Sequence, residues 1–131
     1  MTITLIDGLP YTTVTLTYRG KPHMIDRVLL DTGSGGSVFS TDVLLSCGLH
    51  YEMHDMVHRI RGVGGTEFVF SKNVDRLAVG ELCCEQFAIE VGAMDYGIPL
   101  NGIIGMDFLR AVNAVIDLAQ CRILGHHTCN R

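Results

Sequence analysis

The sequence predicts an all-β domain whose short strands form a barrel-like sheet, accompanied by one or two brief helices. Three observations support this class: strand-like segments recur at regular spacing, glycine-containing turns separate them, and no strand-helix-strand alternation appears. The 131 residues suffice for one domain with its own core and are too few for two ordinary domains. We therefore interpret residues 1–131 as a single domain.

The first two predicted strands form a hairpin. Residues 11–19 alternate between larger side chains and threonines, which is typical of a half-buried strand. A turn at residues 20–22 leads into a second strand at residues 24–30. This apolar strand ends at Asp31, and a loop of glycines and hydroxyl residues follows it.

The middle of the chain predicts a short strand, a short helix and two hairpins. Residues 37–40 read as the strand, and residues 40–48 as a helix that begins with capping hydroxyls and ends at a glycine. Residues 59–70 form two extended arms around a glycine-rich tip. Residues 75–80 and 87–92 are further strands that join across a turn.

The last third predicts a turn, a helix and a closing hairpin. A loop rich in turn-forming residues precedes residues 102–112, an apolar turn with glycines that runs into a short helix. Residues 113–118 and 121–124 then form the closing hairpin. These elements complete the all-β interpretation.

Charge and composition exclude several classes of function. The formal net charge is −4, and no cluster of Lys and Arg offers a surface for nucleic acid. No apolar run is long enough to span a membrane and no signal peptide is evident, so we expect a cytoplasmic protein that binds neither membranes nor nucleic acid. Five cysteines are an odd number, and in a reducing compartment we expect buried thiols rather than disulfides.

The segment LLDTGSGGSVFS at residues 29–40 places a carboxylate at the end of an apolar strand. A lone buried carboxylate is costly unless it is hydrogen-bonded, paired or protonated. Asp31 therefore needs a partner, and the surrounding glycines and hydroxyls indicate a functional loop.

Three segments in order make the chain resemble the retropepsin-like aspartic proteases. They are LLDTGSGGSVFS, RIRGVGGTEFVF and NGIIGMDFL, and together they span most of the chain. The resemblance implies a closed β-barrel of the acid-protease half-domain type with a flap hairpin. Met106 stands where retroviral enzymes usually carry Arg, so the chain is more similar to cellular and bacterial members.

The resemblance implies an aspartic endopeptidase that hydrolyses extended peptides or unfolded protein segments. In this chemistry two carboxylates hold one water and share one proton; one carboxylate deprotonates the water while the other protonates the peptide carbonyl. The chain contains only one Asp-Thr-Gly loop. The second carboxylate is therefore expected from another copy of the chain in a two-fold homodimer.

Site roles follow from the same resemblance. Asp31 would be the catalytic residue, Thr32 would brace the two loops across the two-fold axis, and Gly33 would allow close backbone approach. Ser34 would donate a hydrogen bond to the outer oxygen of Asp31. The flap that closes over substrate would be formed by Gly62, Val63, Gly64 and Gly65. Structural support for the loop would come from Ile103, Ile104 and Gly105.

Two alternatives remain open. The histidines and cysteines offer a rival metal site, with His54 and His58 at helical spacing and His126, His127 and Cys129 near the C-terminus. Neither set has the ligand spacing typical of zinc sites, so we expect no metal and no cofactor. The second alternative is a catalytically silent retropepsin-like module that dimerises or binds peptides. An intact Asp-Thr-Gly motif favours the enzyme.

Overall fold

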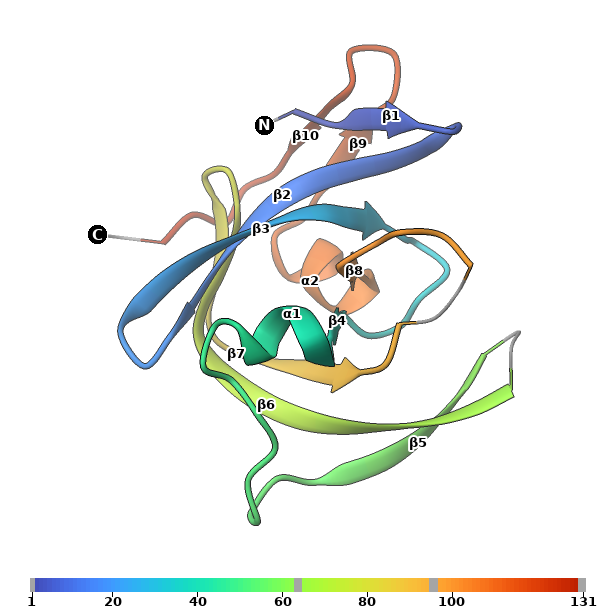
Figure 1. The fold of residues 1–131 in the computed structure, drawn as a ribbon. Helices are drawn as coiled ribbons and strands as arrows, with labels where there is room; N and C mark the ends of the chain where they lie inside the picture. Colours follow the sequence, from blue (N-terminus) through green and yellow to red (C-terminus); the bar gives the residue numbers. More distant parts are fainter. Residues whose placement is uncertain (1, 63–64, 95–96, 130–131) are drawn as a thin grey trace.

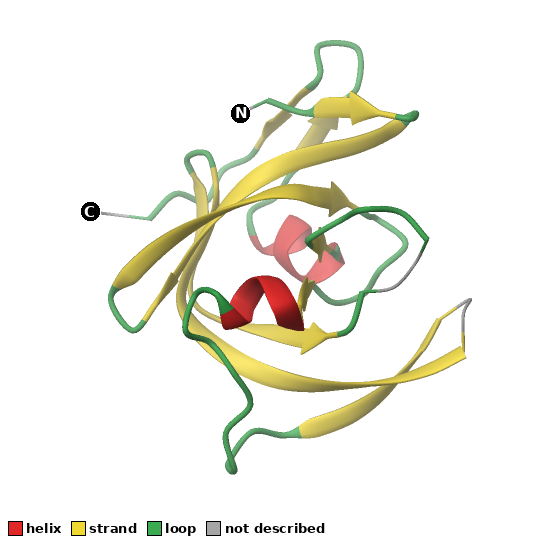
Figure 2. Cartoon of the chain, viewed as in Figure 1, coloured by secondary structure: helices red, strands yellow, loops and turns green. Residues whose placement is uncertain are grey.

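The computed structural model confirms the all-β class (Figure 1). It describes residues 2–62, 65–94 and 97–129. Strands dominate the described chain, and the two helices are short (Figure 2). The strands are β1 (Thr4–Ile6), β2 (Leu9–Tyr18), β3 (Lys21–Leu30), β4 (Val38–Ser40), β5 (Val57–Gly62), β6 (Gly65–Val79), β7 (Leu82–Gly92), β8 (Gly102–Ile104), β9 (Val115–Asp117) and β10 (Arg122–Leu124). The helices are α1 (Thr41–Leu45) and α2 (Met106–Ala111).

The main sheet is closed, as the resemblance implies. Its strands follow the order β1-β2-β3-β8-β4-β7-β6-β5, and an additional pairing joins β2 to β6. In that pairing Leu16 lies opposite Leu77, so the long strands β2 and β6 complete the ring. β1 and β5 extend from the ring, and β9 and β10 form a separate two-stranded sheet.

Tight turns place the long strands next to each other. The hairpin of β2 and β3 turns at Arg19 and Gly20, whose φ angles of 51° and 81° suit a two-residue turn that matches strand twist. Gly80 has a φ of 59° in the turn between β6 and β7. The hairpins expected at residues 11–30 and 75–92 are therefore present.

The barrel interior is apolar, and one face of α2 packs against it. The largest fully buried side chains include Phe39 on β4, Phe108 on α2 and Leu16 on β2. The Phe108 ring meets the ring of Phe87 edge to face, with centroids 5.9 Å apart. A smaller cluster gathers around Tyr11. Burial of these side chains supplies the main driving force for the fold.

Helix α1 and the loop after it are held to the sheet by polar contacts. The hydroxyl of Ser40 accepts a hydrogen bond from the backbone of Val43, which is the N-cap expected from the sequence. Farther along, the buried ammonium of Lys72 on β6 lies 2.6 Å from Glu52 and 2.7 Å from Asp55. This pair of contacts ties the loop to the base of the β5–β6 hairpin.

The expectation that all five cysteines are thiols is wrong for two of them. Cys83 at the start of β7 and Cys129 near the C-terminus form a disulfide, with Cα atoms 5.5 Å apart. The C-terminal segment reaches Cys83 because it runs beside β7, where the backbone of Cys83 donates to the carbonyl of His127. The thiol of Cys84 is buried, and Cys47 and Cys121 are partly exposed thiols.

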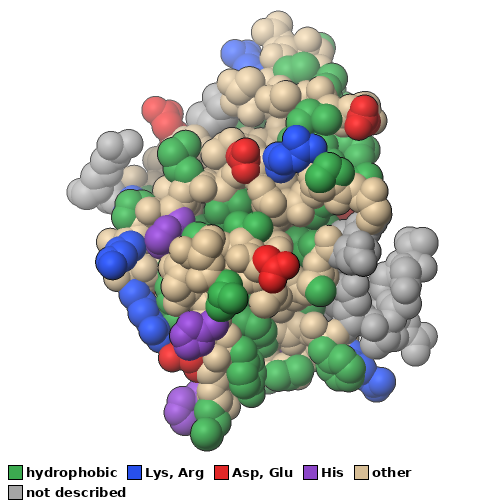
Figure 3. Space-filling view, viewed as in Figure 1, with side chains coloured by type: hydrophobic (Ala, Val, Ile, Leu, Met, Phe, Trp, Pro, Cys, Tyr) green, Lys and Arg blue, Asp and Glu red, His purple; other side chains and the backbone are tan. Residues whose placement is uncertain are grey.

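The surface carries no concentrated basic patch on the face shown in Figure 3. Lys and Arg side chains are scattered there among apolar, acidic and neutral ones. Among the described helices, none is both long and apolar enough to cross a membrane.

Candidate active site

The Asp31 loop begins where β3 ends, beside a part of the sheet that mixes parallel and antiparallel strands. β8 lies between β3 and β4, parallel to β3 and antiparallel to β4. The backbone N–H of Asp31 donates to the carbonyl of Ile104 at 2.9 Å, which extends the β3–β8 pairing by one residue. The sheet therefore fixes the position from which the Asp31 side chain projects.

The Asp31 carboxylate is oriented by its own loop. The N–H of Gly33 donates to Oδ1 of Asp31 at 2.9 Å, and the N–H of Ser34 donates to the Asp31 carbonyl at 3.2 Å. The side chain is half-buried, while Thr32 and Gly33 are exposed. We expected a buried carboxylate, because Asp31 ends an apolar strand. In the single chain Asp31 lies at the surface instead.

Ser34 does not form the hydrogen bond that the resemblance implies. Its hydroxyl donates to the carbonyl of Gly36 at 2.7 Å instead of to the Asp31 carboxylate. The glycine loop curls back over itself, so the nearest acceptor for this hydroxyl is a backbone carbonyl. In the described structure Ser34 shapes the loop and does not contact the carboxylate through its hydroxyl.

Helix α2 abuts the glycine loop at its first turn. The N–H groups of Met106 and Asp107 donate to the carbonyls of Ser34 and Gly35, at 2.7 Å and 3.2 Å. A Cβ at Gly105 would lie 2.3 Å from the Gly36 carbonyl oxygen, far inside contact distance. Only glycine permits this approach, which gives Gly105 a physical role in the support expected for it.

A buried polar network that the sequence did not reveal holds the far end of the loop. Asp107 accepts from the Ser37 hydroxyl at 2.7 Å and from the Ser37 backbone at 3.1 Å. The N–H of Gly105 donates to the Ser37 hydroxyl at 3.0 Å. An aspartate in the first turn of a predicted helix was a visible signal, but no spacing rule connects it to a serine so distant in sequence.

The two isoleucines of β8 face opposite sides of the sheet. Ile104 is fully buried in the main core, whereas Ile103 packs with Tyr11 and Leu100 in the smaller cluster. Because neighbouring side chains on a strand alternate, β8 contributes to the apolar clusters on both faces of the sheet. Neither isoleucine carries a group that takes part in acid-base chemistry.

The predicted flap coincides with the end of the β5–β6 hairpin. Gly62 and Gly65 pair with each other as the last residues of the two strands. Val63 and Gly64, which the resemblance places at the tip, lie outside the described residues. The hairpin projects from the rest of the sheet (Figure 1).

A hollow of about 490 Å³ opens beside the Asp31 loop. It joins Thr32 to the exposed side of α2 and to β9. Its remaining lining residues are Met106, Leu109, Arg110, Asn113, Ala114 and Ile116. The combination of apolar side chains and one arginine is typical of a surface that another protein segment covers.

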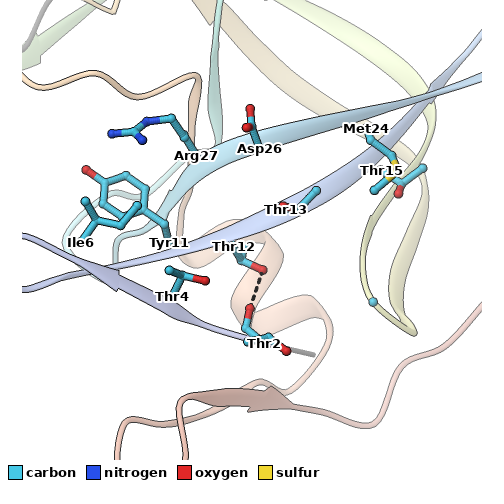
Figure 4. Close-up of a pocket in the computed structure, with 11 residues that line it drawn as sticks. Thr2, Thr4, Ile6, Tyr11, Thr12, Thr13, Thr15, Met24, Asp26 and Arg27 are labelled. Carbon is cyan, nitrogen blue, oxygen red and sulfur yellow. Dashed lines mark hydrogen bonds between the residues drawn. The ribbon is translucent and has the colours of Figure 1, made fainter.

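A second hollow of about 530 Å³ lies on the outer side of β2 and β3, away from the Asp31 loop (Figure 4). Its lining is rich in threonine, with Tyr11, Asp26 and Arg27 on one side. The Thr12 hydroxyl donates to the Thr2 carbonyl at 3.3 Å across it. It has the larger volume of the two hollows, and its lining includes no residue of the Asp31 loop.

The rival metal site is not assembled in the described structure. His54 lies in a turn and His58 on strand β5, so the two do not have the helical spacing that the sequence allowed. Cys129 is joined to Cys83 and carries no free thiol. Within residues 2–62, 65–94 and 97–129, no three His, Cys, Asp or Glu side chains gather as ligands.

Cys84 is no candidate nucleophile, although it lies near the support of the loop. Burial raises the pKa of the Cys84 thiol, and the charge of Asp107 raises it further. The reactive form of cysteine is the thiolate, which a raised pKa disfavours.

Comparison with known proteins assigns the family. A family model described as aspartyl protease matches residues 14–108, from β2 to α2. The chain belongs to this aspartyl protease family. The family is part of the retropepsin-like clan, which agrees with the closed sheet and the Asp31 loop. A search of curated proteins found no match. Membership in the aspartyl protease family supports a peptidase function.

Proposed function

We propose that the chain is an aspartic endopeptidase that acts as a homodimer, with one Asp31 from each copy in a single active site. The observation that carries this proposal is the Asp31 carboxylate itself. Gly33 orients it from the backbone, and it stands half-exposed at the surface of the single chain. A general acid-base residue needs this combination of fixed orientation and access.

The dimer supplies what one chain lacks. Within the described residues, the hydrogen bonds that orient Asp31 come from backbone groups and not from a second acid. A two-fold axis beside the loop brings the same carboxylate from the other copy into reach. Two carboxylates held close share one proton, so that one acts as base while the other acts as acid.

The surface around Thr32 supports this arrangement. Thr32 is exposed and borders the hollow formed with α2 and β9. On the same C-terminal hairpin, Val115 and Leu124 are directly paired and have exposed fractions of 54% and 40%. Exposed apolar side chains on the hairpin whose Ile116 lines this hollow favour coverage by a second copy, because burial of such side chains stabilises association.

In the proposed reaction a water lies between the two Asp31 carboxylates. The ionised carboxylate takes a proton from the water as its oxygen attacks the peptide carbonyl carbon. The protonated carboxylate gives its proton to the carbonyl oxygen, which forms a neutral tetrahedral intermediate. The proton gained from water then passes to the leaving nitrogen as the carbon–nitrogen bond breaks, and a hydroxyl of the intermediate returns a proton to the other carboxylate, which regenerates the shared-proton pair.

Substrate would bind as an extended strand beneath the β5–β6 hairpin. Main-chain hydrogen bonds give an added strand its affinity, and side-chain pockets give it specificity. The hairpin has free strand edges, because β5 is the last strand in the sheet order and β6 pairs with β7 only from Phe70 onward. Its closure over the peptide would exclude water from the reacting bond.

Cleavage of a mixed peptide library from acidic to neutral pH tests this function. We expect Asp31→Asn to lower the cleavage rate by about two to four orders of magnitude, because it removes the acid-base group. Asp42→Asn is the matched control, since Asp42 is exposed on α1. Peptide binding without cleavage by the dimeric wild-type protein would favour the silent binding module instead.

A further inference from the structure

A second carboxylate, Glu90, lies on the same face of the sheet as the residue that leads into the Asp31 loop. Directly paired residues of neighbouring strands point to the same face. The pairings across five strands therefore define one row of side chains that starts two residues before Asp31. The row is Leu29 on β3, Ile103 on β8, Val38 on β4, Glu90 on β7 and Ser71 on β6.

The row continues onto the β5–β6 hairpin. The Nε2 atom of His58 on β5 is hydrogen-bonded to the hydroxyl of Ser71. The same nitrogen lies 3.7 Å from Oε2 of Glu90, beyond hydrogen-bond distance. Glu90 is thus positioned between the Asp31 loop on one side and the outer hairpin strand on the other.

Glu90 also touches the glycine loop. Its backbone N–H donates to the Ser37 carbonyl at 2.9 Å. Its Oε1 atom lies 3.9 Å from the position that a Cβ on Gly36 would occupy. Because Gly36 has no side chain, no side-chain atom of that residue separates the loop from the Glu90 carboxylate.

The Glu90 carboxylate is incompletely satisfied. Its side chain has an exposed fraction of 29%, yet Oε2 is shielded from solvent and has no hydrogen-bond partner among the described residues. A shielded carboxylate oxygen without a donor raises the free energy of the unliganded protein. A donor that arrives with the substrate would relieve this cost.

We propose that Glu90 is a specificity residue that receives a Lys or Arg side chain of the peptide substrate. The inference rests on the proposed function, because it places the peptide between the Asp31 loop and the β5–β6 hairpin. Three strand spacings separate Glu90 from β3, or roughly 14 Å. An extended peptide rises about 3.3 Å per residue, so the basic residue lies within about four positions of the cleaved bond.

Matched peptides measure this preference directly. A peptide that the enzyme cleaves is made with Lys, Gln or Glu at each position within four residues of the cleaved bond. We expect kcat/KM at one position to be about tenfold higher for Lys than for Gln, the scale of one charge-assisted hydrogen bond at a partly exposed site. In Glu90→Gln this ratio falls to near one, and in Glu90→Lys the peptide with Glu becomes the better substrate.

Glu85→Gln is the matched control. Glu85 lies on the same strand, is exposed, and pairs with Arg76 at 3.1 Å away from the row. Its substitution removes the same charge and is expected to keep the tenfold ratio. A wild-type ratio near one at every position, or an unchanged ratio in Glu90→Gln, overturns the inference.

Binding separates this inference from the proposed function. Fluorescence anisotropy measures the affinity of the same peptides for Asp31→Asn and for Asp31→Asn with Glu90→Gln. Tighter binding of the Lys peptide only when Glu90 is present supports the inference even if the wild-type protein cleaves nothing. Equal affinities for Lys and Gln peptides overturn it even if cleavage depends on Asp31. Raising the salt concentration with wild-type protein must also lower the Lys preference, a test that needs no folded variant.

Discussion

The hydroxyl of Ser37 donates a 2.7 Å hydrogen bond to Oδ1 of Asp107, 70 residues later in the chain. Through this contact the end of the Asp31 loop is joined to the first turn of α2. The same carboxylate also accepts from the backbone of Phe108 at 2.8 Å. The loop that carries Asp31 is therefore positioned as much by α2 as by the strand that precedes it.

Loss of the Ser37–Asp107 contact is expected to destabilise the fold. Ser37→Ala and Asp107→Asn should each lower the free energy of unfolding by about 1–3 kcal/mol, because each leaves a buried polar group without its partner. The double variant should cost less than the sum of the two, with a coupling of about 0.5–3 kcal/mol. Urea unfolding measures these values, and strictly additive losses would contradict a direct contact.

Gly105→Ala is expected to disturb the Asp31 loop. The new Cβ would meet the Gly36 carbonyl at 2.3 Å, so α2 and the loop must move apart. Overpacking of this kind costs about 1–3 kcal/mol. Gly35→Ala is the matched control, because a Cβ there meets nothing within 4 Å. The melting temperature and the rate of peptide cleavage should fall far more in Gly105→Ala than in Gly35→Ala.

The contacts of Lys72 predict a loss of stability in acid. The hydrogen bond from Lys72 holds the pKa of Glu52 below its ordinary value, against the opposing effect of burial. Burial raises the pKa of Asp55, but hydrogen bonds from Lys72 and from the Glu52 backbone outweigh it and lower that pKa. Lowered carboxyl pKa values stabilise the fold above the unfolded-state pKa, and this stabilisation is lost as the pH falls below about 4.

Lys72→Met tests the origin of this pH dependence. Without the ammonium, the difference in urea midpoint between pH 7 and pH 3 should shrink. Lys21→Met, at an exposed position on β3, should keep the full difference. An equal difference in both variants would show that other carboxylates govern the acid response.

Reduction of the Cys83–Cys129 disulfide is expected to lower stability. The bridge closes a sequence separation of 46 residues, and disulfides typically contribute about 2–4 kcal/mol. Cys129→Ser should therefore lower the melting temperature and abolish its dependence on reductant. Cys121→Ser, which alters a thiol outside the bridge, should retain that dependence.

Much of the fold was predictable because its local patterns agree with its tertiary structure. Alternation along residues 11–19, glycines at the turns and the hydroxyl cap before α1 each led to an element that the structure contains. The closing contact between β2 and β6 was not visible in sequence, since no pairing rule connects strands so far apart. The path of the C-terminal segment beside β7, and with it the disulfide, was hidden for the same reason.

The position of the Asp31 loop could be predicted from the sequence, but its contacts could not. The Asp-Thr-Gly motif predicts Asp31 as the catalytic residue, and the structure places its carboxylate directly after β3, where the N–H of Gly33 donates to it. The acceptor of the Ser34 hydroxyl depends on how the loop curls, which residue types do not specify. Glu90 and His58 lie close together only because of how their strands pair. Their positions in the sequence do not reveal this proximity.

The most direct test of the central claim is cleavage by mixtures of wild-type and Asp31→Asn chains after subunit exchange. If each active site needs one Asp31 from each copy, activity follows the square of the wild-type fraction, and an equal mixture retains about a quarter of the activity. If each chain acts alone, an equal mixture retains about half and the dependence is linear. A quadratic dependence is the predicted result, and a linear one contradicts a shared active site.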